Sequence, residues 1–130
     1  MSAGSQAKIL IIDDDETILM QVEKILTKNG YNPVCVNSGK EGLQKAFTEK
    51  PDVIILDRRM PEMDGNETLI ELKADEYTKN IPVMMLTGDN RIEDVSSSLE
   101  LGAVDYVVKP FDQDNFLMRL EKALKTRNGN

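Results

Sequence analysis

Residues 9–15 read ILIIDDD, so four consecutive aliphatic side chains are followed directly by three aspartates. An apolar run without alternation is typical of a parallel strand whose two faces are both covered by helices. Further runs occupy residues 33–36, 53–56, 83–86 and 103–108. Helical patterns separate the five runs, which indicates repeated strand–helix units. The sequence therefore predicts a doubly wound α/β fold.

Apolar residues at helical spacing predict which sides of the helices face the core. One stripe covers residues 18–26 and another covers residues 116–124. Further helices are expected at about residues 66–74 and 91–101.

The helix between the second and third strands is predicted by its first residues. Ser38 is followed three positions later by Glu41, which is a capping-box pattern. Leu43, Ala46 and Phe47 come next, and we expect all three to point inward.

Length and charge set the domain count and the class of protein. The chain has 130 residues and a formal net charge of −7. We expect one domain at residues 7–125, preceded by a flexible tail or expression remnant at 1–6 and followed by a polar tail at 126–130. The negative charge and the lack of a Lys/Arg run argue against direct binding to nucleic acid or to an anionic membrane.

Cysteine and histidine contents restrict the chemistry. Cys35 is the only cysteine, so no disulfide forms within the chain, and no long apolar run predicts a membrane span. We therefore expect a cytoplasmic protein. With no histidine, acid–base and metal chemistry depend on carboxylates, Lys, Tyr or water.

Polar side chains follow four of the five predicted strands. Asp13 and Asp14 follow the first strand, Asp57 the third, Thr87 the fourth and Lys109 the fifth. The carboxyl ends of parallel strands share one edge of the sheet, where ligands of such folds bind. We expect these side chains to converge there.

Three clustered aspartates repel one another unless a cation lies among them. Carboxylates without His or Cys favour Mg²⁺, for which Mn²⁺ is expected to substitute. Lys109 and the Thr87 hydroxyl suit phosphate oxygens, and a carboxylate such as Asp57 is a known phosphoryl acceptor. The pattern predicts magnesium-dependent phosphoryl transfer to Asp57.

The motifs together resemble the receiver domain of two-component response regulators. They are Asp13-Asp14, Asp57 followed by Met60-Pro61-Glu62-Met63-Asp64-Gly65, Thr87-Gly88, Tyr106, and Lys109-Pro110-Phe111. The resemblance implies a flavodoxin-like (βα)5 fold with a parallel sheet of order 2-1-3-4-5 and a cis peptide at Lys109-Pro110.

It also implies roles for individual residues. Asp14, Asp57 and the Arg59 carbonyl would bind the metal, with Asp13 acting through water. Thr87 and Tyr106 would form the switch, and Arg59 and Asp89 would form an opposite-charge pair at the rim of the pocket. Arg58 departs from the family pattern, which more often has an aliphatic residue there.

The implied partners are a histidine kinase or histidine phosphotransfer protein, and a downstream protein or effector domain. The latter would contact the face made by the fourth helix, fifth strand and fifth helix. Such a chain is mainly a signalling phosphoacceptor that catalyses its own phosphorylation and dephosphorylation, as a monomer or a phosphorylation-dependent dimer. Asp105 and Arg119 resemble one ion pair of the family's dimers, but Val95, Val104 and Asn115 replace charges found there.

Other interpretations remain open at this point. Residues 11–17 also resemble the Asp-x-Asp-x-Thr motif of haloacid-dehalogenase-like phosphatases, with Asp13 as nucleophile. Asp15 and Asp112 fit simple helix caps. Tyr106 fits a half-buried strand aromatic without a switching role.

Overall fold

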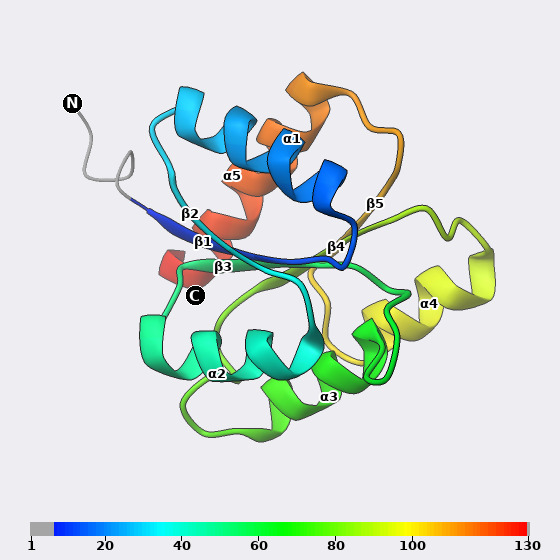
Figure 1. Cartoon of the computed structure of the whole chain (residues 1–130). Coiled ribbons are helices and arrows are strands. Elements are labelled where there is room, and N and C mark those ends of the chain that lie inside the picture. Colours follow the sequence, from blue (N-terminus) through cyan, green and yellow to red (C-terminus); the bar gives the residue numbers. More distant parts are fainter. Residues whose placement is uncertain (1–6, 130) are drawn as a thin grey trace.

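The computed structural model describes the backbone of residues 7–129 and the side chains of residues 7–126. The tail expected at residues 1–6 lies outside the described part. Strands and helices alternate strictly along the chain (Figure 1). The elements are β1 (Lys8–Ile12), α1 (Glu16–Lys28), β2 (Asn32–Val36), α2 (Gly39–Glu49), β3 (Val53–Leu56), α3 (Gly65–Ala74), β4 (Val83–Thr87), α4 (Ile92–Glu100), β5 (Asp105–Val108) and α5 (Gln113–Gly129).

The five strands form one parallel sheet in the order β2-β1-β3-β4-β5. In the register at its centre, Ile11 pairs with both Cys35 and Ile55. All residues of β3 and β4 are buried, as the apolar runs predicted. The predicted fold class and strand order are confirmed.

Alternate residues of each strand enter two separate cores. Ile9 and Ile11 pack against α1 and α5, whereas Leu10 and Ile12 pack against α2 and α3. Figure 1 shows α1 and α5 on one side of the sheet and α2, α3 and α4 on the other. Because both faces are covered, the only open part of the central strands is their ends.

The prediction for Phe47 is wrong. Its side chain is 52% exposed and packs edge to face against Tyr77, with ring centroids 5.5 Å apart. The buried residues of α2 are Gly39, Gly42 and Ala46, and a Cβ on Gly42 would overlap the Ile12 side chain of β1. The helix approaches β1 so closely that small residues occupy the contact, which rotates Phe47 outward.

The C-terminal helix is longer than predicted. Residues 126–129, expected to form a polar tail, continue α5 to Gly129. The Thr126 hydroxyl donates to the carbonyl of Lys122 at 3.2 Å. A helix that is already nucleated gains one backbone hydrogen bond for each added residue, so it extends without an apolar stripe.

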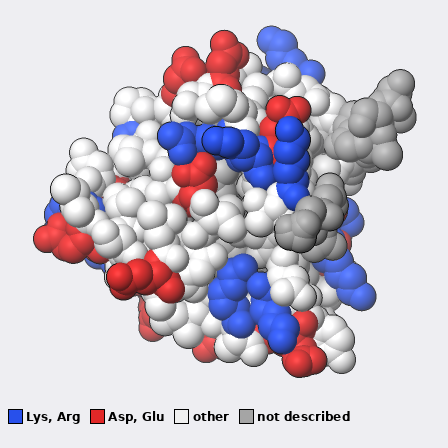
Figure 2. All heavy atoms as spheres, turned by 180° about the vertical axis from the view of Figure 1, so that it is seen from behind, with Lys and Arg blue, Asp and Glu red and all other residues white. Residues whose placement is uncertain are grey.

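Charged side chains of both signs are scattered over the face in Figure 2, with acidic groups beside the gathered basic ones. Of the helices within residues 7–129, none combines the length and apolar content needed to cross a bilayer.

Gly65 provides a test of how tightly α3 packs on the end of β3. Its N–H donates to the Arg58 carbonyl at 2.9 Å, and a Cβ there would overlap the Asp57 carbonyl oxygen. We expect Gly65→Ala to lower the free energy of unfolding by about 1–3 kcal/mol, because the backbone must shift. Gly88→Ala is the control, since nothing lies within 4 Å of its added Cβ. Equal urea midpoints for the two variants would contradict the expectation.

Candidate functional site

The strand ends bring the predicted polar residues together. Asp57 donates its N–H to the Ile12 carbonyl at 2.9 Å, directly beside Asp13. On the other side, the N–H of Lys109 donates to the carbonyl of Thr87 at 2.8 Å. These bonds continue the sheet ladder past the strands, so side chains from four strands are placed along one edge.

The carboxylates of Asp13, Asp14 and Asp57 form a compact cluster. One oxygen of each lies within 4.8 Å of the others. Asp13 and Asp57 are buried, at 3% and 6% exposure, whereas Asp14 is exposed. A set of oxygen donors open to solvent on one side fits Mg²⁺, which keeps several water ligands.

Lys109 is the cation nearest to these carboxylates among the described residues. Its Nζ donates to Asp13 Oδ2 at 2.9 Å and lies 3.9 Å from Asp57 Oδ1. Asp13 also accepts the N–H of Asp15 at 2.9 Å, which fixes its other oxygen. The Lys109-Pro110 peptide is cis, as the resemblance implied.

The environment of Asp57 disfavours its charged form. Burial raises the pKa of Asp57 to about 6, and the negative charge of Asp13 acts in the same direction. Lys109, the Thr87 hydroxyl and the backbone N–H of Arg59 act in the opposite direction. The carboxylate is therefore held in a pocket that favours any added positive charge.

Helix caps account for the remaining strand-end aspartates. Asp15 Oδ1 accepts the N–H of Thr17 at 2.9 Å, and Asp112 Oδ2 accepts the N–H of Asn115 at 2.9 Å. Asp64 forms a complete capping box with Glu67 at the start of α3. The cap interpretation of Asp15 and Asp112 is confirmed.

The predicted rim pair is present, but it belongs to a larger set of charges. Arg59 Nε donates to Asp89 Oδ2 at 2.9 Å. Arg91 also contacts Asp89, at 3.4 Å, and Asp94, at 3.0 Å, while Arg58 reaches Asp94 at 3.2 Å. We call these five residues the rim network. Hydrogen bonds from Arg91 and Arg59 lower the pKa of Asp89, although burial acts against them.

Sequence reasoning missed the roles of Arg58, Arg91 and Asp94. The spacing of Arg91 and Asp94, three residues apart at a helix start, was a usable signal for one ion pair. The contact from Arg58 to Asp94 spans 36 positions and left no such signal.

An open pocket of about 390 Å³ adjoins Asp57. Its lining consists of Asp57, Arg59, Thr87, Gly88, Asp89, Arg91 and Lys109. Two arginines of the rim network, Arg59 and Arg91, therefore face the same space as the Asp57 carboxylate.

Tyr106 lies beneath this rim. Its side chain is already buried, and its hydroxyl donates to the Asp89 carbonyl at 2.6 Å. Burial, followed by the charges of Asp89 and Asp94, raises the pKa of Tyr106 to about 12, so the hydroxyl stays a donor. Thr87, 1% exposed, accepts the N–H of Asp89 at 3.3 Å. Tyr106 therefore has a buried orientation, fixed by its hydrogen bond to the Asp89 carbonyl.

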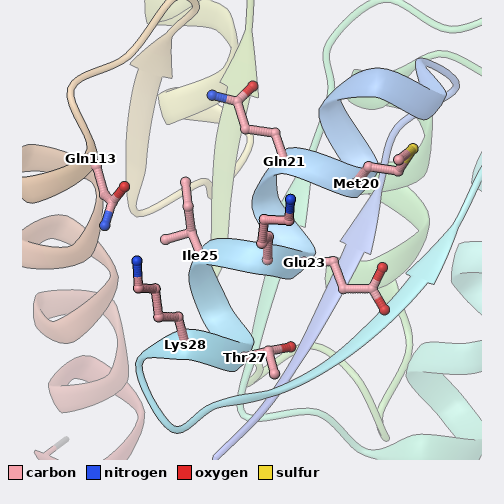
Figure 3. A pocket seen from close by; sticks show the side chains of 8 residues that line it. Met20, Gln21, Glu23, Ile25, Thr27, Lys28 and Gln113 are labelled. Atoms are coloured by element: carbon pink, nitrogen blue, oxygen red, sulfur yellow. The ribbon is translucent and has the colours of Figure 1, made fainter.

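A larger pocket, of about 860 Å³, lies away from this edge. In Figure 3, Ile25 and Lys28 of α1 and Gln113 of α5 face the gap between the two helices. None of the predicted site residues lines this pocket.

Fold and site together define an open α/β protein with an acidic pocket at the carboxyl edge of its sheet. Comparison with known families matches residues 9–121 to the response regulator receiver domain. The chain belongs to that family, whose members are phosphorylated by histidine kinases. The haloacid-dehalogenase alternative is not supported.

Curated relatives include the alkaline phosphatase synthesis transcriptional regulatory protein PhoP of Bacillus subtilis, 38% identical over 91% of this chain and 48% of its own length. The transcriptional regulatory protein ZraR of Escherichia coli is 40% identical over 89% of this chain and 26% of its own. The chain thus spans about half or less of these relatives. Among solved structures, chemotaxis protein CheY4 of Vibrio cholerae has 33% identity and a TM-score of 0.86, covering 91% of this chain and 98% of its own.

The raised pKa of Asp57 leads to a pH-dependent stability. The folded protein binds this proton more tightly than the unfolded chain, so stability falls as pH rises from 3.8 towards about 6 and stays lower above that. We expect Asp57→Asn, measured without divalent metal, to raise the free energy of unfolding at pH 7 by about 1–2 kcal/mol, a value reduced for partial solvent screening. Below pH 4 the difference should vanish.

The control is Asp112→Asn, because Asp112 is exposed and asparagine also caps helices. Adding Mg²⁺ should reduce the difference in free energy of unfolding between Asp57→Asn and wild type, because the ion stabilises the wild type alone. If Asp57→Asn is no more stable than wild type at pH 7, the charged Asp57 carboxylate does not destabilise the fold.

Proposed function

We propose that Asp57 accepts a phosphoryl group from a phosphohistidine of a histidine kinase or histidine phosphotransfer protein. A carboxylate oxygen of Asp57 attacks phosphorus, the phosphorus–nitrogen bond breaks, and the imidazole leaves with its electron pair and takes a proton from water. The product is an acyl phosphate. The observation that carries the proposal is the buried Asp57 carboxylate, 3.9 Å from Lys109 and grouped with two further carboxylates.

Asp14, Asp57 and the Arg59 carbonyl would hold Mg²⁺, with Asp13 acting through water. When bound, the ion supplies positive charge to the phosphoryl oxygens. Substitution of Mn²⁺ for Mg²⁺ stays a prediction, as does a cytoplasmic location.

Lys109 and Thr87 would bind oxygens of the phosphoryl group after transfer. The Lys109 ammonium, freed in part from Asp13, neutralises one oxygen, and the Thr87 hydroxyl donates to another. Since Thr87 also accepts the Asp89 N–H, its movement would disturb the loop whose carbonyl holds Tyr106. Thr87 and Tyr106 would thereby act as the switch.

The output face proposed for this switch comprises α4, β5 and α5, which would contact a downstream protein or effector domain. Asp105 of β5 and Arg119 of α5 are paired within the chain at 2.7 Å. The chain would act as a monomer or as a phosphorylation-dependent dimer.

Acetyl phosphate with Mg²⁺ tests the acceptor. We expect the intact mass of the wild type to increase by one phosphoryl group, and Asp57→Asn to remain unlabelled because an amide cannot form the acyl phosphate. Asp14→Ala should label more slowly and lose Mg²⁺ binding, while the cap variant Asp112→Asn should behave as wild type. Magnesium-dependent labelling of a folded Asp57→Asn protein would overturn the assignment.

The Arg59–Asp89 pair should slow hydrolysis of the acyl phosphate by limiting access of water to the pocket. Exposed ion pairs contribute about 0.2–1 kcal/mol, so we expect Arg59→Ala and Asp89→Ala each to accelerate dephosphorylation by at most roughly fivefold. The effect should shrink at high salt, and the double variant should be less than additive. The rate of phosphate release at low and high salt measures the dephosphorylation. An unchanged lifetime of the acyl phosphate in both single variants would show that the Arg59–Asp89 pair does not limit access of water.

A further inference from the structure

Arg58 follows the acceptor directly and is a largely buried cation. Its side chain is 11% exposed, with Nη1 3.3 Å from Asp64 Oδ2 and Nη2 3.2 Å from Asp94 Oδ1. Its Nε is buried without a hydrogen-bond partner among the described residues. A buried guanidinium is tolerated only when it is paired, so the position of Arg58 depends on these two carboxylates.

The two carboxylates belong to the starts of two different helices. Asp64 is the N-cap of α3, and Asp94 lies in the first turn of α4. Arg58 therefore connects both helices to the residue beside Asp57. Its planar fork suits this task, because two terminal nitrogens point in fixed directions.

The first turn of α4 has few other anchors. Its N-cap residue, Arg91, makes no side-chain cap hydrogen bond, and Ser98 is the one residue of α4 classed as buried. Asp94 is 14% exposed and is contacted by Arg58, Arg59 and Arg91 at 3.2, 3.5 and 3.0 Å. Ion pairs with the loop after β3 thus take the place of the usual side-chain cap at this end of α4, where Val95 supplies an apolar contact with the core.

The backbone beside Asp57 is equally constrained. Gly65 at the start of α3 donates to the Arg58 carbonyl and leaves no room for a Cβ against Asp57. The backbone of residues 57 and 58 is thus packed on α3, while the Arg58 side chain reaches α4. Residues 57 and 58 are thus in contact with both helices.

We propose that Arg58 is a positioning residue that couples Asp57 to α4: it holds the first turn of α4 in the unmodified protein and transmits changes at the acceptor to that helix. The coupling rests on the proposed function, because it starts from phosphorylation of Asp57. The positioning of α4 by Arg58 in the unmodified protein is independent of that function.

Amide exchange of residues 91–97, followed by mass spectrometry on the full chain, tests both parts. Without a phosphoryl mimic, we expect the amides of residues 91–97 to exchange roughly three- to tenfold faster in Arg58→Leu than in wild type. Amide exchange in α2 should be unchanged. Arg58→Lys should restore only part of the protection, since one ammonium cannot bridge both carboxylates. Lys40→Leu, which removes an exposed cation on α2, should have no effect at 91–97.

Asp94→Asn breaks the same contact from the other side and serves if Arg58→Leu unfolds. It should also accelerate exchange at 91–97, and the double variant should add little to the larger single effect. Exchange at 91–97 within twofold of wild type in both folded single variants would overturn the positioning role.

The coupling is measured by adding beryllofluoride with Mg²⁺. We expect it to change exchange at 91–97 in wild type at least about threefold more than in Arg58→Leu. Equal responses would overturn the coupling while leaving the proposed function intact. If wild type neither responds nor accepts a phosphoryl group from acetyl phosphate, the proposed function and the coupling both fail, whereas faster exchange in unmodified Arg58→Leu still supports the positioning role.

Discussion

The constraint on which the site depends is the repulsion among three aspartates at one edge of the sheet. Asp13 and Asp57 are buried, and neither strand end can move away, because the sheet ladder continues through Asp57 to Ile12. Lys109, which follows the outer strand β5 at the same edge, offsets part of the repulsion. Burial, and after it the negative charge of Asp13, raises the pKa of Asp57, and the cluster of carboxylates favours a divalent cation. The scaffold thus holds Asp57 in surroundings that favour added positive charge, such as a bound divalent cation.

A second set of charges surrounds this pocket and has a different effect. The rim network joins the loop after β3 to the loop after β4 and to α4. Its members alternate in sign, so opposite charges approach within about 3–3.5 Å across elements that share little buried apolar surface. Contacts of this kind are easily rearranged when a nearby charge changes. These ion pairs therefore tie the first turn of α4 to the loop that carries Arg58 and Arg59.

Agreement between sequence and structure follows the range of the interactions concerned. Apolar runs predicted β1, β3 and β4 because burial on both faces leaves a local pattern. The predicted cap formed by Ser38 involves Glu41, three positions away, and is equally local. The prediction that Phe47 points inward is wrong, because the orientation of side chains on α2 depends on how closely the helix approaches β1 at Gly42. The predicted end of α5 is too early, because a helix can extend without an apolar pattern in its sequence.

By itself the sequence determined the fold class, the strand ends at which Asp13, Asp57, Thr87 and Lys109 lie, and hence the chemistry available there, because parallel strands bring their carboxyl ends to one edge. Only the tertiary structure decided which oxygen Lys109 binds, that Tyr106 is buried against the Asp89 carbonyl, and that Arg58 bridges α3 and α4. These contacts join residues far apart in the chain. Their partners depend on the packing of loops, and neither periodicity nor spacing encodes that packing.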